Sequence, residues 1–175
     1  REIDKIAEIT NTEDISVSLP VVDKGDQPKY KILLVEDDKD VRDYLRKSLE
    51  AEYTVIEAAD GVRAYEKVVQ DFPDLVLSDI MMPKRDGLEL CTMIKNDIRV
   101  GHIPVILMTA RSMVVHIKEG FQAGADDYIV KPFNMDVLQT RIRSLLTLRE
   151  QLKKLYGKRF SPEVMGIEVK SADER

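Results

Sequence analysis

The chain has 175 residues, of which 43% are hydrophobic and 34% are charged, and its formal net charge is −5. This length supports one compact core with tails and is too short for two ordinary domains. The acidic balance gives no electrostatic reason to bind nucleic acid or an anionic membrane, and the apolar runs are too short to span a bilayer. The single cysteine, Cys91, excludes an intramolecular disulfide and is spaced like a core residue of a helix.

The first 29 residues differ from the rest because they are polar and interrupted by Pro20, Gly25 and Pro28. Apolar residues alternate with serine over 15–19, which predicts one half-buried strand followed by a linker over 23–28. A lone strand cannot bury its apolar face. We therefore interpret residues 1–29 as the tail of a preceding domain.

From Tyr30 onward, strand patterns alternate with helix patterns. Strands are predicted over 32–35, 53–56, 75–78, 105–108 and 128–130. Helices are predicted to open near Asp38, after Gly61, after Gly87, over about 112–122, and after the capping residue Asn134. The expected apolar stripe of the second helix is Val62, Tyr65, Val68, Val69 and Phe72, and that of the third is Leu88, Cys91 and Ile94. This alternation predicts an α/β fold with a parallel sheet covered by helices on both faces.

The last predicted helix is unusually long, since its apolar residues recur every three to four positions. They are Met135, Leu138, Ile142, Leu145, Leu148, Leu152 and Leu155. Its first half can pack on the sheet, whereas the part beyond Leu148 would project from a domain of this size. Two interpretations stay open, namely a frayed end and a helical linker or dimerising helix. The closing segment 167–175 has too little apolar content to fold alone.

Charged or hydroxyl side chains follow four of the predicted strands. Glu36 and Asp37 follow the first, and Asp79, Thr109 and Lys131 close three others. Each residue alone is ordinary in a loop, cap or turn, and we assign the adjacent Asp38 to helix capping. Carboxyl ends of parallel strands meet at one edge, however, and clustered carboxylates destabilise a site unless a cation joins them. A divalent cation such as Mg²⁺, with a lysine opposite, would suit phosphoryl transfer.

The chain resembles the receiver domains of two-component response regulators. The resemblance covers roughly residues 31–147 and rests on the motifs ILLVEDD (32–38), DLVLSDIMMPKRDGLEL (74–90), PVILMTA (104–110) and GADDYIVKPF (124–133). It implies a flavodoxin-like, doubly wound sheet of five parallel strands in the order 2-1-3-4-5, extended here by the C-terminal helix. Residues 30–148 would form this receiver domain.

The resemblance also implies roles for individual residues. Asp79 would be the phosphoacceptor, and Mg²⁺ would be held by Glu36, Asp37, Asp79 and the backbone carbonyl of Met81. Lys131 would pair with the phosphoryl group, while Thr109 and Tyr128 would switch position with it. Pro83 and Gly87 would shape the loop after Asp79, and Pro132 matches a position whose preceding peptide bond is cis in the family. Met81 and Arg111 match positions that affect phosphoryl lifetime.

The two tails carry weaker resemblances. Residues 15–20 look like the closing strand of a histidine kinase ATP-binding domain, and IEVKSADER (167–175) is similar to the lead-in to an AraC-type helix-turn-helix domain. This implies a receiver from a hybrid histidine kinase of Bacteroidetes type, with residues 149–175 leading to an output domain that regulates transcription. The chain itself would be no enzyme and no nucleic-acid or membrane binder. Its expected partners are a kinase domain and a second copy, and its expected location is the cytoplasm, with a parent that could be anchored in the inner membrane.

Three alternatives stay open from the residues themselves. A degenerate receiver would serve only as a dimerisation module, although the full set of strand-end residues argues against it. A flavodoxin would need a phosphate loop rich in Ser, Thr or Gly after the first strand, where this chain is acidic. A Mg²⁺-dependent phosphatase would need a second acid soon after its nucleophile, where this chain has Met81.

Overall fold

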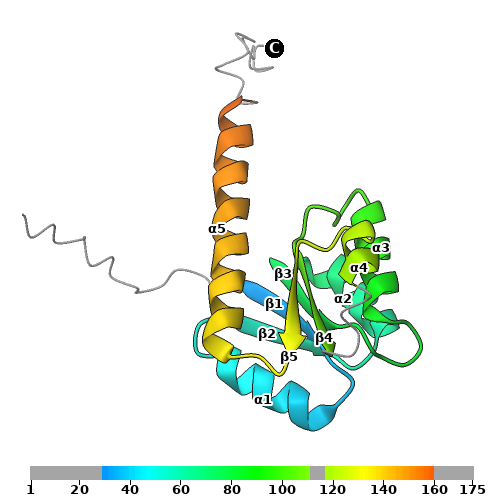
Figure 1. Ribbon diagram of the computed structural model, residues 1–175. Coiled ribbons are helices and arrows are strands. Elements are labelled where there is room, and N and C mark those ends of the chain that lie inside the picture. The colour runs from blue at the N-terminus through cyan, green and yellow to red at the C-terminus, as the bar shows by residue number, and fades with distance from the viewer. Residues whose placement is uncertain (1–28, 111–116, 160–175) are drawn as a thin grey trace, which may run out of the picture.

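A computed structural model describes residues 29–110 and 117–159 of the chain (Figure 1). Within these ranges, strands and helices alternate as the sequence predicts. The strands are β1 (Lys31–Val35), β2 (Thr54–Ala58), β3 (Leu75–Asp79), β4 (Val105–Ala110) and β5 (Asp127–Lys131). The helices are α1 (Lys39–Leu49), α2 (Gly61–Asp71), α3 (Gly87–Asn96), α4 (Ile117–Gln122) and α5 (Met135–Arg159).

The five strands form one parallel sheet in the order β2-β1-β3-β4-β5, which confirms the predicted topology. Their register aligns the carboxyl ends of the strands at a single edge. Val35 lies opposite Ser78, Asp79 opposite Met108, and Ala110 opposite Lys131. The residues that follow these strands are therefore brought together although they are distant in sequence.

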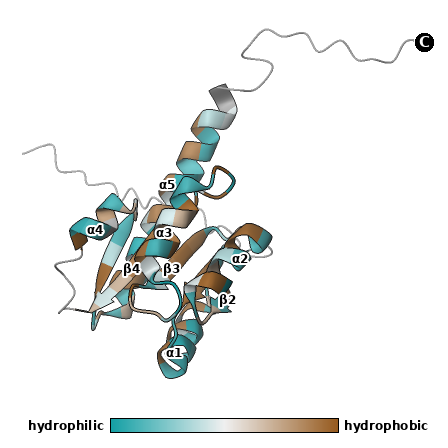
Figure 2. Ribbon diagram, turned by 90° about the vertical axis from the view of Figure 1, so that its right-hand side faces the viewer, coloured by the Kyte–Doolittle hydropathy of each residue, from teal (hydrophilic) through white to brown (hydrophobic). Residues whose placement is uncertain are grey.

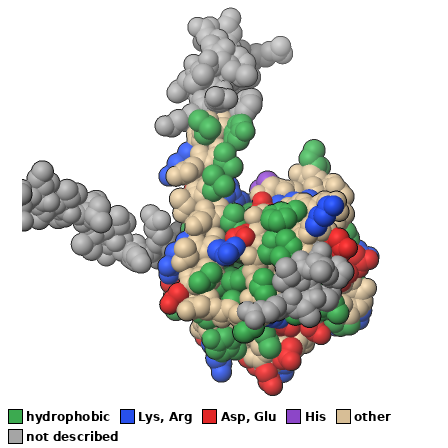
Figure 3. Space-filling view, viewed as in Figure 1, with side chains coloured by type: hydrophobic (Ala, Val, Ile, Leu, Met, Phe, Trp, Pro, Cys, Tyr) green, Lys and Arg blue, Asp and Glu red, His purple; other side chains and the backbone are tan. Residues whose placement is uncertain are grey.

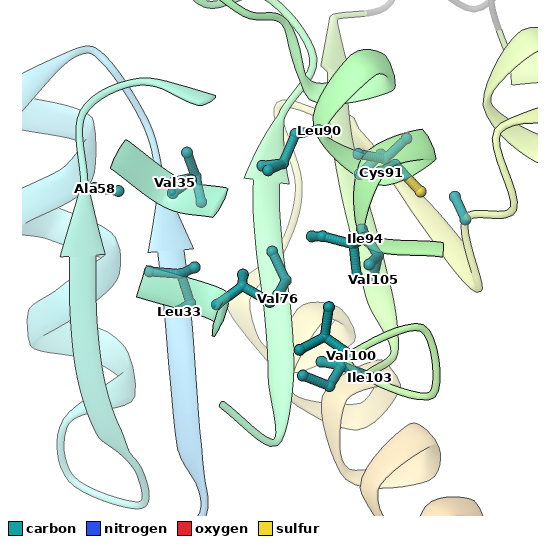
Figure 4. Close-up of a cluster of buried hydrophobic side chains, with 14 of the residues drawn as sticks. Leu33, Val35, Ala58, Val76, Leu90, Cys91, Ile94, Val100, Ile103 and Val105 are labelled. Carbon is teal, nitrogen blue, oxygen red and sulfur yellow. The ribbon is translucent and has the colours of Figure 1, made fainter. Parts of the chain in front are cut away.

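Alternate residues of the strands point to opposite faces of the sheet and build two cores. One core includes Leu33, Val35, Val76 and Val105 and is covered by α2 and α3, with Cys91 inside it as expected (Figure 4). The other core uses the intervening positions of the same strands and is covered by α1 and the first half of α5, with these members: Ile32, Leu34, Leu75, Leu77, Ile106, Met108, Leu45, Leu49, Leu138 and Ile142. The strands read as continuous apolar runs because both faces are buried, as Figure 2 shows for β3 and β4.

The predicted stripe of α2 is partly wrong. Ala64 and Val68 are buried, but Val62 and Phe72 are exposed. Phe72 adopts a left-handed conformation as the C-cap of α2, directly before Pro73, so its side chain leaves the helical face. In α3, the predicted Cys91 and Ile94 are fully buried, and Leu90 joins them.

Helix α5 continues well past the sheet, as predicted. Its inward residues Leu138, Ile142 and Leu146 are buried, whereas Leu148 and the apolar residues after it are exposed. Figure 1 shows the second half of α5 standing clear of the body, beyond the edge where the strands begin. The sequence placed Leu145 on the inward stripe but did not identify Leu146, which is the more deeply buried of the two.

Local signals in the sequence are confirmed at two helix starts. The Asp38 carboxylate accepts hydrogen bonds from the Asp40 and Val41 amides at 2.9 and 3.1 Å, and the Asn134 side chain accepts one from Asp136 at 2.8 Å. Across the described ranges, no helix combines the length and apolar character that crossing a membrane requires. The predicted strand over 15–19, the helical residues 112–116, Arg111 and the segment 167–175 lie outside the described residues.

Candidate functional site

The first acidic pair sits where β1 turns into α1. Glu36 is 1% exposed, whereas Asp37 is open to solvent. The Glu36 amide continues the ladder to the carbonyl of Ala58 at 3.1 Å, and the Arg42 guanidinium donates to the Glu36 carbonyl at 2.7 Å. Because the backbone of Glu36 is held from both sides, its carboxylate is fixed in position at the sheet edge.

Asp79 and Lys131 meet Glu36 at this edge from β3 and β5. Asp79 is the last residue of the central strand and is 9% exposed. The Lys131 Nζ lies 2.9 Å from Glu36 Oε2 and 3.1 Å from Asp79 Oδ2. One ammonium group thus bridges two buried carboxylates that are 43 positions apart in the sequence, which confirms the convergence that the strand order predicts.

The charges at this site are out of balance. Burial raises the pKa of the Glu36 carboxyl above its ordinary value. The hydrogen bond from Lys131 lowers this pKa, and the charge of Asp79 raises it further. Burial works to lower the pKa of the Lys131 ammonium, but its two carboxylate partners outweigh burial and raise it. Among the described residues, the three carboxylates of Glu36, Asp37 and Asp79 share the single cation of Lys131, so the site favours an additional positive charge.

The donor set fits a hard divalent cation. Glu36, Asp37 and Asp79 each offer a carboxylate oxygen, and these atoms lie within 4.8 Å of one another. Only carboxylate oxygens contribute, without any sulfur or imidazole, and such ligands suit Mg²⁺ or Ca²⁺ rather than a soft transition metal. Asp37 is exposed, so a bound cation could keep part of its water shell.

Thr109 and Tyr128 lie inside the domain, Thr109 next to the carboxyl end of β4 and Tyr128 nearer the amino end of β5. Thr109 is 1% exposed, and its hydroxyl donates to the Ala110 carbonyl at 3.3 Å. Tyr128 is buried with its hydroxyl donating to the Ile117 carbonyl, and its ring meets that of Phe121 edge-on at 4.6 Å. Burial raises the pKa of the Tyr128 hydroxyl. This tyrosine therefore connects β5 to the short helix α4.

The loop after Asp79 is packed tightly against the strand. The Gly87 amide donates to the Ile80 carbonyl at 2.8 Å, and a side chain at Gly87 would collide with the Asp79 backbone. Pro83 lies in this loop, whereas Met81 has an exposed side chain. The bond between Lys131 and Pro132 is cis.

Sequence reasoning missed two residues that shape the site. Arg42 supports the Glu36 backbone and also lies 3.4 Å from the Glu57 carboxylate, yet on the helix it looks like any exposed cation. Gly61 was interpreted only as a helix start, but a side chain there would strike the Arg85 carbonyl. No periodic or spacing signal in the sequence could have identified either contact, because both depend on tertiary packing.

Comparisons with known proteins agree with this geometry. The family profile of the response regulator receiver domain matches residues 32–143. "Histidine kinase P4" of Formosa agariphila is 38% identical over 165 residues, which is 90% of this chain and 12% of the kinase. "Response regulator MprA" of Mycobacterium ulcerans is 44% identical over 117 residues, which is 66% of this chain and 50% of the regulator.

A solved structure is similar as well. The signal receiver domain of a signal transduction histidine kinase from Syntrophus aciditrophicus superposes with a TM-score of 0.63 at 28% identity, covering 83% of this chain and 98% of that one. The chain thus spans nearly the whole of an isolated receiver domain. It spans only half or less of the two curated relatives.

Proposed function

Because the chain belongs to the response regulator receiver domain family, we propose that it accepts a phosphoryl group on Asp79 from a histidine kinase. The observation that carries this proposal is the meeting of Asp79, Glu36 and Lys131 at the carboxyl edge of the sheet, with Asp37 beside them. A structural module would gain nothing from three clustered carboxylates, which repel one another. The site therefore supports phosphotransfer over a degenerate dimerisation module.

The Asp79 carboxylate is placed to act as the nucleophile. One of its oxygens would attack the phosphorus of a phosphohistidine, forming the new P–O bond as the P–N bond breaks and the imidazole leaves with that electron pair. The product is an aspartyl phosphate, an acyl phosphate. The Lys131 ammonium, 3.1 Å from Asp79 Oδ2, is placed to hold a phosphoryl oxygen and offset its charge.

We propose Mg²⁺ as the cofactor of this site. Glu36, Asp37 and Asp79 would hold it together with the backbone carbonyl of Met81, in agreement with the oxygen-only donor set. When bound, the cation supplies charge neutralisation for the transferring group. Glu36 and Asp37 then keep their carboxylates oriented, while Asp79 supplies the attacking oxygen.

The same edge would convert the added charge into a change of shape. The Thr109 hydroxyl is held only by a 3.3 Å contact to a neighbouring carbonyl, so it could turn to donate to a phosphoryl oxygen. Tyr128 would then change position and alter the surface formed by α4, β5 and α5. This is a two-state switch biased by a local change of charge.

The surrounding protein would be longer than this chain. We propose that residues 1–29 end a kinase ATP-binding domain, that 30–148 form the receiver, and that 149–175 lead to an output domain that controls transcription. The similarity to a histidine kinase over 90% of the chain supports a hybrid kinase origin. The chain would act in the cytoplasm as a phosphoacceptor rather than an enzyme, within a parent that could be anchored in the inner membrane. A second copy would bind through the C-terminal helix.

Acetyl phosphate tests the acceptor directly because it supplies a phosphoryl group without a kinase. We expect the chain with Mg²⁺ to gain one phosphoryl group by intact mass, in a form that hydroxylamine removes, as it does from an acyl phosphate. Asp79→Asn removes the nucleophile but keeps the size of the side chain, so it should stay unlabelled. Label retained in Asp79→Asn would contradict the assignment.

A further inference from the structure

The second half of α5 presents an unpartnered apolar stripe, which we define as Leu148, Leu152, Leu155 and Tyr156. These side chains are 51%, 43%, 50% and 54% exposed. Figure 3 shows hydrophobic side chains gathered along the part of α5 that stands clear of the body. The three leucines follow one another at four and three residues, the spacing of a seam between two paired helices.

The stripe only partly continues the face that packs on the sheet. The inward face passes through Leu138, Ile142 and Leu146, and then reaches Arg149. At 3.6 residues per turn, Leu148 and Leu155 lie roughly 100° around the helix from that face, whereas Tyr156 lies in line with Leu138. The described part of the chain leaves all four side chains about half exposed, so another molecule can approach them.

Charged side chains are arranged so that two such helices can meet. Glu150, Lys153 and Lys154 lie on the side of the helix away from the leucines, and Lys153 lies 3.6 Å from Glu150. Arg149 is turned toward the body, where it pairs with Asp74 at 3.2 Å. Next to the leucines stands the uncharged Gln151. Among the side chains described up to Gly157, two copies of the stripe would meet without placing like charges in contact.

The surface beside Leu148 is hollowed. A depression of about 420 Å³ runs along α5 and is lined by Thr140, Arg143, Ser144, Thr147, Leu148 and Gln151. Its one charge, on Arg143, is paired with Glu52 at 2.6 Å. Short hydroxyl side chains leave room for side chains of a facing helix, which pack as knobs into such holes.

We propose that a second copy of this chain covers the stripe, so that Leu148, Leu152 and Leu155 of each copy pack together across a two-fold axis. The stripe would then be the contact surface of the dimer proposed above. This dimer does not depend on phosphotransfer. Four half-exposed side chains offer roughly 200–300 Å² per copy, less than the ~800 Å² of a standard interface. The isolated chain should therefore pair weakly, with a dissociation constant on the order of 100 μM.

Sedimentation equilibrium of the 175-residue chain measures this pairing. Between about 10 μM and 1 mM, we expect the mean mass to rise from that of one copy toward that of two. Leu152→Glu places a charge at the centre of the stripe, so it should weaken pairing at least ~10-fold. Circular dichroism checks that this variant stays folded, which is expected because Leu152 does not contact the core.

Disulfide cross-linking tests which face is used. In Leu152→Cys the new thiol lies at the centre of the stripe, so it faces its counterpart whether the helices run parallel or antiparallel. Lys154→Cys is the matched control, because it places an exposed thiol on the opposite face. Copper phenanthroline with dissolved oxygen takes up the two electrons and protons that the thiols lose. The native Cys91 is fully buried and does not compete.

We expect Leu152→Cys to cross-link at least ~10 times faster than Lys154→Cys. Equal rates, a monomer at 1 mM, or a dimer that Leu152→Glu leaves intact would each overturn the proposal. If the chain stays monomeric, the stripe would bind a partner other than a second copy. Failure of pairing can be distinguished from failure of the phosphoacceptor assignment. Asp79→Asn should pair like the parent chain, and a variant that no longer pairs should still be labelled on Asp79.

Discussion

Gly87 lies closer to strand β3, which ends in Asp79, than any residue with a side chain could. A Cβ at this position would lie 2.2 Å from the Asp79 carbonyl oxygen and 2.9 Å from the Ile80 Cα, and both are backbone atoms that cannot rotate away. Either α3 or the end of β3 would have to move. The residue type at position 87 therefore controls where the Asp79 carboxylate is held.

We predict that Gly87→Ala lowers the free energy of unfolding by about 2 kcal/mol, as overpacking does, and slows labelling of Asp79 by acetyl phosphate. Urea unfolding measures the first effect. Gly157→Ala is the matched control, because nothing lies within 4 Å of its added methyl group. Because alanine favours the helix more than glycine does, Gly157→Ala should raise the free energy of unfolding by up to ~1 kcal/mol. Equal stability of Gly87→Ala and the parent would contradict the close approach.

The Cys91 thiol should be unreactive in the folded chain. Cys91 is fully buried, and burial raises the pKa of its thiol from 9.0 to about 11. At pH 8 the native thiolate population is then about 100-fold smaller than for a free thiol. We predict that a disulfide reagent labels the native chain at least ~100-fold more slowly than the urea-unfolded chain.

The same shift of the Cys91 pKa sets the sign of a pH effect. Between pH 9 and 11 the native thiol keeps the proton that the unfolded chain releases, so the native state binds more protons and stability falls as the pH rises. Cys91→Ala should remove this contribution. Rapid labelling of the native chain at pH 8 would show that the α3 face opens readily.

At the scale of elements, Arg149 decides how α5 leaves the domain. Its guanidinium donates to the Asp74 carbonyl at 2.7 Å and lies 3.2 Å from the Asp74 carboxylate. The other oxygen of that carboxylate accepts from the Lys31 amide at 2.8 Å. The projecting helix is thereby tied to the amino ends of β3 and β1, the strands that carry Asp79 and Glu36 at their other ends.

We predict that Arg149→Met frees the second half of α5. Hydrogen exchange should become at least ~10-fold faster over residues 148–157, while residues 135–146 keep the protection that core packing gives them. Lys154→Met removes a charge one turn away that faces solvent, and it should leave exchange unchanged. Unchanged protection in Arg149→Met would mean that helix propensity alone holds this segment.

The sequence predicted some elements more accurately than others. Strands buried on both faces were predicted well, because their apolar runs end in Glu36, Asp79 and Lys131, and the sheet order then followed from the family resemblance. The stripe of α2 was predicted less well, since Phe72 has the right spacing but leaves the helix in a left-handed cap. Contacts such as Arg42 with the Glu36 carbonyl depend on packing between elements, which one sequence does not encode locally.

Across the whole molecule, the fold places the acidic site and the apolar stripe at opposite ends of the sheet. The acidic site lies at the carboxyl edge of the sheet, and the projecting stripe of α5 extends beyond the amino edge (Figure 1). Helix α5 spans the distance between them, since it begins four residues after Lys131 and carries Arg149 at the far edge. A rigid helix of this length can transmit a movement near β5 to whatever binds the stripe.

The charge imbalance at the acidic edge predicts how the whole domain responds to Mg²⁺. Glu36, Asp37 and Asp79 repel one another in the folded state, and among the described residues Lys131 is the cation that offsets them, so a cation bound there stabilises the folded state over the unfolded one. At ten times the dissociation constant the gain is about 1.4 kcal/mol, which raises the melting temperature by ~3–6 °C. Differential scanning fluorimetry with MgCl₂ against NaCl at matched ionic strength measures this shift.

Two variants show whether that shift in melting temperature arises at the acidic edge. Asp37→Asn removes an exposed carboxylate that has no structural partner among the contacts of the described site, so it should abolish the Mg²⁺ shift at little cost in stability. Lys131→Met removes the ammonium that pairs with Glu36 and Asp79, so it should lower the melting temperature without Mg²⁺ and enlarge the Mg²⁺ shift, because the added ion then relieves more repulsion. An equal shift in the parent chain and both variants would place the bound cation elsewhere and leave the acidic edge without a metal.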